Sequence, residues 1–124
     1  MTEQANIEAA RTLFAAWERW DLDTVESVVA DDAVDRRPQS DEEFVGRANI
    51  MAMYREVPGP PDITWRRIRG GPQVWVAQGV VDYGEGPVHI IGIVEFADGM
   101  AVKSDFYFAD PFEPPESRAR WASP

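Results

Sequence analysis

Asp35 and Arg37 stand two residues apart in Ala33–Arg37, a segment that alternates like a short β-strand. Because alternate residues of a strand point to the same face, the two side chains are expected to lie side by side. A carboxylate placed there can act as a base or orient a water molecule, and the guanidinium can orient it or stabilise a developing oxyanion. Tyr54, on a helix expected from Arg47 to Val57, can donate a hydrogen bond. The sequence therefore predicts Asp35, Arg37 and Tyr54 as catalytic residues.

Two considerations bear on this prediction. An arginine beside an aspartate lowers the pKa of the carboxyl group, which makes Asp35 a weak base near neutral pH unless burial raises its pKa again. Asp35 and Arg37 can equally be a partly buried ion pair that serves no substrate, and this structural explanation stays open.

His89 is the single histidine of the chain. In the expected strand pairing it faces outward opposite Tyr107, so we interpret it as a surface or interface residue and not as a base. The chain has no cysteine, its carboxylates are scattered, and its glycine pairs lie in strand turns and not before helices. No metal and no cofactor are therefore expected.

Size and charge narrow the class of protein. The chain has 124 residues, 44% of them hydrophobic and five of them tryptophan, which predicts one folded domain over residues 1–124. Twenty-two acidic against twelve basic residues give a net charge of −10, which repels phosphate backbones and anionic membranes. No apolar run reaches the roughly 20 residues of a membrane span, and the N-terminus resembles no secretion signal. We expect a soluble, cytoplasmic protein that binds neither nucleic acid nor membrane.

Helical periodicity occupies the first half of the chain. Apolar residues recur every three or four positions from Glu3 to about Trp20, which predicts a helix with one buried face. A second, short helix is expected after Asp21-Leu22-Asp23, with one of these aspartates as its cap, and is expected to end at Asp31-Asp32. Pro38 to Glu43 is interpreted as a polar loop. The third helix, which carries Tyr54, is stopped by Pro58-Gly59-Pro60-Pro61.

The second half has the periodicity of strands. Ile63–Ile68, Val74–Tyr83 and the two arms of Val88–Ala109 are expected as four antiparallel strands, with bends at Gly79 and Gly92. Helices followed by a meander of strands predict an α+β fold with the helices on one side of the sheet.

The pairing inside Val88–Ala109 depends on its turn. A three-residue loop Ala97-Asp98-Gly99 is the first interpretation, and it leaves Asp105 and Tyr107 on the outer face. Its inner face then collects apolar residues, among them Ile90, Val94, Phe106 and Phe108. A two-residue Asp98-Gly99 turn shifts the pairing by one residue and brings Asp105 and Tyr107 to the inner face. Both registers stay open at this point.

Several short motifs, in this order and spacing, carry a resemblance to a known fold. They are Ala16-Trp17 through Asp21-Leu22-Asp23, Ala30-Asp31-Asp32-Ala33-Val34, Phe44-Val45-Gly46-Arg47 with Ile50, and Phe96-Ala97-Asp98-Gly99-Met100. With them the chain resembles the nuclear transport factor 2-like superfamily and its SnoaL-like family of polyketide cyclases, ketosteroid isomerases and limonene epoxide hydrolases, in an uncharacterised bacterial branch. The resemblance implies a cone-shaped roll, with N-terminal helices packed on the concave face of a curled antiparallel sheet. It does not imply one activity, since this fold hosts enzymes, binding proteins and interaction modules.

The catalytic groups of the ketosteroid isomerases do not carry over to this chain. Counted without gaps, their general base, their first-helix tyrosine and their strand acid correspond to Arg37, Leu13 and Gly92. A shift of two residues would bring Asp35 to the position of the base, so that assignment requires a shorter loop.

The epoxide hydrolase machinery is incomplete as well. The resemblance places Asp35 and Arg37 at its first-strand pair, but Val81 and Phe106 at its two catalytic aspartates. The alternative register would let Asp105 replace one of them, which keeps a hydrolase open.

The implied interior of the cone is mainly apolar, which suits a hydrophobic ligand. The expected ligand-binding residues are Leu13, Trp17, Met51, Trp75, Ile90, Val94, Phe106 and Phe108. We therefore expect a pocket protein that binds a hydrophobic small molecule, with isomerase, lyase or hydrolase activity as the options. The alternative is a non-catalytic dimeric interaction module whose cone is filled by side chains. A cavity lined by Trp17, Tyr54 and Phe106 would favour the first.

Two expectations concern surfaces. A homodimer is expected through the outer sheet face, because Val76, Val80, Ile91 and Ile93 would otherwise expose an apolar patch. The tail 110–124 holds four prolines and is expected to pack on the domain through its aromatic residues.

Overall fold

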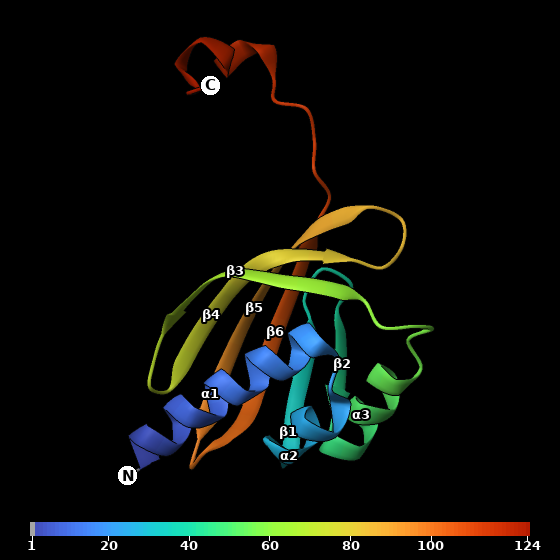
Figure 1. The fold of residues 1–124 in the computed structure, drawn as a ribbon, viewed down its shortest axis with the longest axis vertical. Helices are drawn as coiled ribbons and strands as arrows, with labels where there is room; N and C mark the ends of the chain where they lie inside the picture. Colours follow the sequence, from blue (N-terminus) through green and yellow to red (C-terminus); the bar gives the residue numbers. More distant parts are fainter. Residues whose placement is uncertain (1) are drawn as a thin grey trace.

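Helices and a curled sheet form two layers. In the computed structural model, which describes residues 2–124, the helices are α1 (Thr2–Arg19), α2 (Leu22–Ser27) and α3 (Arg47–Arg55). The strands are β1 (Val29–Arg37), β2 (Glu42–Val45), β3 (Asp62–Gly70), β4 (Val74–Asp82), β5 (Pro87–Ala97) and β6 (Met100–Ala109). The helices cover the concave face of one sheet with the strand order β2-β1-β6-β5-β4-β3 (Figure 1). The expected α+β fold is confirmed.

The sheet is mixed, because β1 pairs parallel to β6 while all other neighbours are antiparallel. The long connection between these two strands permits this direction, which a short hairpin could not. Part of the expected polar loop 38–43 belongs to β2, which pairs antiparallel with β1. Asp31 and Asp32 do not end a helix but lie exposed within β1, at the irregularity where its pairing with β6 shifts between Val29 and Val34.

The core lies between α1, α3 and the concave face of the sheet. Its most deeply buried large side chains include Leu13, Phe14, Met51, Val81 and Val94. The helical and strand periodicities of the sequence thus meet in one apolar layer.

The turn between β5 and β6 is the two-residue one. Asp98 and Gly99 both have positive φ, 51° and 77°, and Ala97 pairs with Met100 across the turn. Asp-Gly suits a turn of this kind because both residues tolerate the left-handed conformation. The three-residue loop expected first from the sequence is therefore wrong.

The faces of the hairpin nevertheless follow the first interpretation. The register shifts between Glu95 and Phe96, where Val102 is an extra residue on β6. This bulge reverses the effect of the shorter turn, so that Phe106 points inward and Asp105 outward. Asp105 accepts a 2.8 Å hydrogen bond from Arg36 Nε on the outer face. The register that would have brought Asp105 and Tyr107 inside is wrong.

The two strand glycines serve different purposes. A Cβ on Gly79 would overlap the carbonyl oxygen of Thr64, beside the register shift between Trp65 and Arg67. A Cβ on Gly92 would lie 2.7 Å from the Phe106 ring, so this glycine makes room for an aromatic side chain inside the cone.

The C-terminal tail leaves β6 and extends away from the domain (Figure 1). It ends in a short 3₁₀-helix, η1 (Glu116–Trp121). Phe112 and Trp121 are 77% and 69% exposed, so within this chain the tail does not pack on the domain as expected. No helix in residues 2–124 is both long and apolar enough to cross a membrane.

Candidate active site

Asp35, Tyr54 and Arg37 form one hydrogen-bonded cluster. Asp35 points inward from β1 and is 1% exposed, while Tyr54 reaches it from α3. The Tyr54 hydroxyl donates to Asp35 Oδ2 at 2.6 Å. Arg37 Nη2 lies 3.3 Å from the same carboxylate oxygen and 3.3 Å from Tyr54 Oη. The alternation of β1 and the position of Tyr54 on α3 thus bring together the three residues predicted from the sequence.

Burial dominates the electrostatics of this cluster. It raises the pKa of Asp35, and Arg37, Tyr54 and Ser104 only partly counter that effect. Burial, and then the negative charge of Asp35, raise the pKa of Tyr54 well above its usual value, so its hydroxyl stays protonated. Asp35 is therefore a better proton acceptor than an exposed aspartate, and Tyr54 is its hydrogen-bond donor.

Some polar atoms of the cluster remain unpaired. Asp35 Oδ1 and Arg37 Nε are buried without a hydrogen-bond partner among residues 2–124, and so is Trp17 Nε1. Trp17, Asp35 and Ser104 line a small cavity of about 20 Å³. A space of that size accommodates one water molecule, which has polar partners in these side chains.

A much larger cavity, of about 630 Å³, opens beside the cluster. Its lining is mainly apolar and consists of Trp17, Trp20, Arg37, Gln39, Ser40, Glu42, Phe44, Met53, Tyr54, Val57, Tyr83, Phe106 and Phe108. Its exposed polar residues, Gln39, Ser40 and Glu42, form the rim. Asp35 does not line this cavity, so it contacts the larger space only through Arg37 and Tyr54.

Arg37 is the single cation in the lining, and aromatic rings surround it. Its Cζ lies 4.9 Å from the centre of the Phe106 ring, 5.6 Å from Phe108 and 5.8 Å from Tyr54. Its side chain is 17% exposed, and among residues 2–124 its side-chain hydrogen bonds are made by Nη2. A guanidinium carries five N–H groups, so those on Nη1 remain free for an acceptor in the cavity.

The expected ligand-binding residues separate into groups. Trp17, Phe106 and Phe108 line the large cavity, and Trp17 also lines the small one together with Leu13 and Val94.

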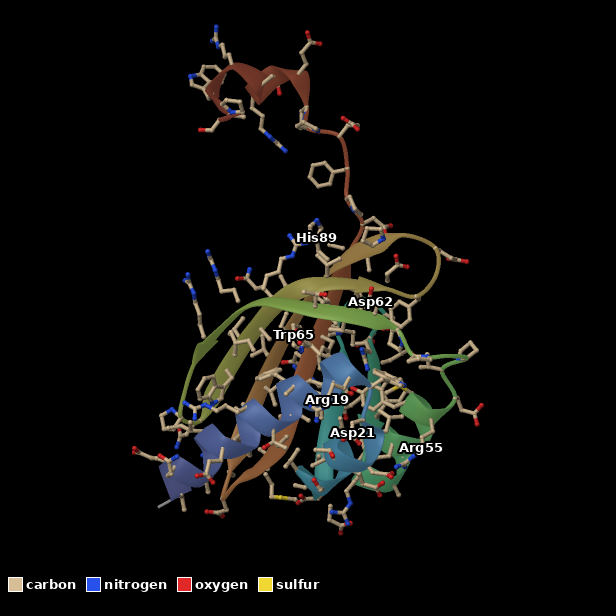
Figure 2. The ribbon with its side chains drawn as sticks, in the orientation of Figure 1. Arg19, Asp21, Arg55, Asp62, Trp65 and His89 are labelled. Carbon is tan, nitrogen blue, oxygen red and sulfur yellow. The ribbon has the colours of Figure 1, made fainter. Side chains whose placement is uncertain are left out.

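The remaining three lie elsewhere. Met51 and Ile90 are buried in the core and line neither cavity. Trp75 lines a separate groove of about 390 Å³ between α1 and β3, where Trp65 Nε1 donates to the backbone oxygen of Phe14 (Figure 2). His89 is exposed opposite Ala109, near the point where the tail leaves β6 (Figure 2).

Several residues that line the large cavity were not predicted from the sequence. Tyr83 lies at the end of β4 and contacts Phe108, while the Gln39 side chain holds the backbone of Phe108 through both its amide nitrogen and its oxygen. Trp20 packs edge-on against Tyr54, with ring centres 5.8 Å apart. For Trp20 and Tyr83, an aromatic residue at the end of an expected helix or strand was the one feature of the sequence that could have indicated a place in the cavity lining. Among the described residues, no three histidine, aspartate or glutamate side chains are grouped to hold a metal ion.

The fold and its cavity define an α+β cone with an apolar pocket and a buried polar cluster. Residues 10–104 match the SnoaL-like domain family. The chain belongs to this family, which confirms the resemblance drawn from the sequence motifs. No match was found among curated proteins.

Solved structures agree with this assignment. An NTF-2-like protein of unknown function from Burkholderia xenovorans LB400 is 33% identical, with a TM-score of 0.88 over 98% of this chain and 95% of that one. An LEH-like epoxide hydrolase from M. tuberculosis is 20% identical, with a TM-score of 0.70 over 86% and 84%. TerC, co-crystallised with polyporic acid, is 20% identical, with a TM-score of 0.71 over 84% and 91%. The last two similarities establish the fold alone.

Proposed function

We propose that this protein binds a flat, hydrophobic small molecule whose oxygen atom accepts a hydrogen bond from Arg37. The observation that carries the proposal is the cavity of about 630 Å³ lined by Trp17, Tyr54 and Phe106. Mainly apolar walls with one cationic donor are typical of sites that bury an apolar body and orient it by a single polar contact. That TerC was crystallised with polyporic acid supports the use of this fold for small molecules.

Within this site, Arg37 and Tyr54 contact the ligand and Asp35 positions them. The buried carboxylate accepts the hydrogen bond of the Tyr54 hydroxyl, so that when Tyr54 Oη takes a proton from the ligand its own hydroxyl proton passes to Asp35 Oδ2, and the raised pKa of Asp35 favours this transfer. Arg37 stabilises negative charge that develops on the ligand oxygen. This arrangement favours an isomerase or lyase that moves a proton. A hydrolase has less support, because Asp105 lies on the outer face with Arg36.

The alternative function, a non-catalytic module with a filled cone, is disfavoured by the open cavity. We propose that the protein acts in the cytoplasm as a homodimer joined through its outer sheet face. Val76, Val80, Ile91 and Ile93 lie on that face and are only half-buried in the single chain.

The test uses two probes of nearly equal shape, 2-acetylnaphthalene and 2-ethylnaphthalene, titrated calorimetrically into the full-length protein. The ketone should bind about tenfold or more tightly than the hydrocarbon, because a hydrogen bond from a charged donor contributes about 1.5–3 kcal/mol. Arg37→Met should remove this preference while the hydrocarbon still binds. Asp105→Asn, on the outer face, is the matched control and should change neither affinity. If neither probe binds below millimolar concentration, the pocket proposal is wrong. Equal binding of both probes overturns only the role of Arg37.

A further inference from the structure

The C-terminal arm, residues 110–124, is an exposed, proline-containing segment that carries two large aromatic side chains. All of its residues are exposed, and Phe112 and Trp121 are 77% and 69% exposed. The Trp121 ring packs on Arg120, whose Cζ lies 4.1 Å from the ring centre. Two large aromatic side chains held in water on one short segment are typical of a surface that binds another molecule.

Prolines fix the direction of the arm. Pro111, Pro114 and Pro115 interrupt regular structure, and Pro115 is extended, with φ −63° and ψ 140°. The arm leaves β6 and continues past the end of the sheet (Figure 1). In this direction the arm leads away from its own domain (Figure 1). Its prolines limit the backbone freedom of residues 111–115, which lowers the conformational entropy lost on binding.

The outer face of the sheet is the matching surface. The helices cover the concave face, which leaves Val76, Val80, Ile91 and Ile93 without a covering element (Figure 1). Together with Tyr107, which is 37% exposed, they form an apolar stripe across the outer face.

Charged side chains lie next to this apolar stripe. Arg67 and Arg69 pair with Gln78 and Val76 across β3 and β4, so they lie on the outer face next to the stripe. Neither arginine is in an ion pair within residues 2–124. The first part of the arm carries the complementary acids Asp110, Glu113 and Glu116 around Phe112, while Arg118 and Arg120 lie in its last part beside Trp121.

Resting on the homodimer proposed above, we propose that its arms make the contact through the outer sheet face: the arm of each chain packs on this face of the second copy, so that two arms are exchanged in a symmetric homodimer. The lengths agree. Residues 110–115 at ~3.1 Å each extend roughly 19 Å, within the roughly 30 Å of a strand as long as β4, with nine residues, and η1 turns aside at the end of this extended part (Figure 1). Exchange between two copies closes the assembly, because each copy supplies one arm and one face.

The solved structures differ in how much of this chain their alignments cover. The alignment with the 33% identical protein covers 98% of this chain, which leaves about three residues outside it and so includes the arm. The epoxide hydrolase and TerC align over 86% and 84%, a span that the body without the arm can account for.

The test compares full-length variants by sedimentation equilibrium across nanomolar to micromolar concentrations. The unaltered chain should sediment as a dimer, at twice its mass of 14.0 kDa. Phe112→Ser combined with Trp121→Ser should raise the dimer dissociation constant about tenfold or more, with unchanged circular dichroism because both residues are exposed. Ile68→Ser is the matched control: Ile68 is 43% exposed but lines the groove near Trp75 and should leave the dimer intact.

Trypsin cleavage after Arg118 and Arg120 gives an independent measurement. Cleavage of the arm should slow at concentrations where the chain is dimeric and should be fast in the double serine variant. A dimer that tolerates both serine substitutions overturns the proposal, and so does an arm that remains cleavable in the dimer. A monomer with a protected arm overturns it as well and places the arm on its own domain. If Ile68→Ser weakens the dimer as much as the arm variant does, the assigned docking face is wrong.

Discussion

Removal of the Tyr54 hydroxyl tests whether the buried cluster has the electrostatics that its geometry implies. Tyr54→Phe keeps the ring, so the substitution leaves no large cavity. It removes the 2.6 Å hydrogen bond to Asp35 Oδ2 and the weaker 3.3 Å contact with Arg37 Nη2. Of the side-chain hydrogen bonds to Asp35 among the described residues, the 3.3 Å contact with Arg37 would then remain, beside the weaker influence of Ser104.

The expected magnitude follows from the charge of Asp35. A hydrogen bond to a charged acceptor contributes about 1.5–3 kcal/mol, against about 1 kcal/mol between neutral groups. We expect Tyr54→Phe to lower the free energy of unfolding by about 2–3 kcal/mol at pH 7. At acidic pH, where Asp35 is protonated, the loss should shrink to about 1 kcal/mol.

The sign of the pH dependence can be worked out from the pKa of Asp35. Burial raises this pKa in the folded state, so protonated Asp35 favours folding at low pH, and that contribution is lost as the pH rises through the raised pKa. The Tyr54 hydrogen bond lowers the pKa of Asp35, so less stability is lost as the pH rises. In Tyr54→Phe the pKa of Asp35 rises further, and stability should fall more steeply with increasing pH.

The assay is urea unfolding, followed by tryptophan fluorescence, at several pH values at which both proteins are folded. Tyr83→Phe is the matched control, because Tyr83 lines the same cavity, is 53% exposed and has no hydroxyl hydrogen bond among the described residues. Its cost should stay below about 0.5 kcal/mol. Equal costs for the two variants at pH 7, or a Tyr54→Phe cost independent of pH, would refute the reasoning.

Two further substitutions test the fold around the site. Gly79→Ala should lower the free energy of unfolding by about 2–4 kcal/mol in the same assay. The added Cβ would clash with the backbone of Thr64 and Trp65, which cannot change rotamer as a side chain can. An unfolding midpoint equal to that of the unaltered protein would contradict this close approach. Asp105→Asn should leave the unfolding midpoint nearly unchanged, because its partner Arg36 is an exposed residue on the outer face; a loss comparable to that of Tyr54→Phe would mean that Asp105 belongs to the site.

Local periodicity predicted the cluster, and its placement relative to the cavity required the folded chain. Asp35 and Arg37 share a face because strand side chains alternate, and Tyr54 lies on the buried side of its helix. The sequence could not indicate that Asp35 lies behind Arg37 and Tyr54, since this depends on how far α3 sits from β1. It also left undecided whether burial or Arg37 controls the pKa of Asp35, and burial does.

The hairpin illustrates a second limit. Asp98-Gly99 marked the turn correctly, since positive φ at two successive residues favours this pair. The sequence around Val102 does not indicate that this residue forms a bulge. The bulge arises from the way β6 pairs with Glu95 and Phe96 of β5 on a curled sheet. Two deviations, a shorter turn and a bulge, cancel, and the side chains beyond Val102 point as first expected.

Two residues that line the large cavity, Gln39 and Phe44, could not be predicted from the sequence for a related reason. Gln39 contributes because its side chain holds the backbone of Phe108, a contact between segments far apart along the chain. Phe44 contributes because β2 pairs with β1, where a polar loop was expected next to it. Both depend on tertiary pairing that neither segment encodes by itself.

The unpaired atoms of the cluster bear on the choice between the proposed site and a merely structural ion pair. A buried ion pair stabilises a fold only when hydrogen bonds satisfy its remaining donors and acceptors, and replacement by apolar residues is often neutral or favourable. Here Asp35 Oδ1 and Arg37 Nε are buried without partners, and burial leaves the carboxylate with a raised pKa. Arg37 and Tyr54 also line the apolar cavity, where a ligand oxygen can meet a cation. Together with the unpaired atoms, this supports the proposal that the cluster serves binding and proton transfer.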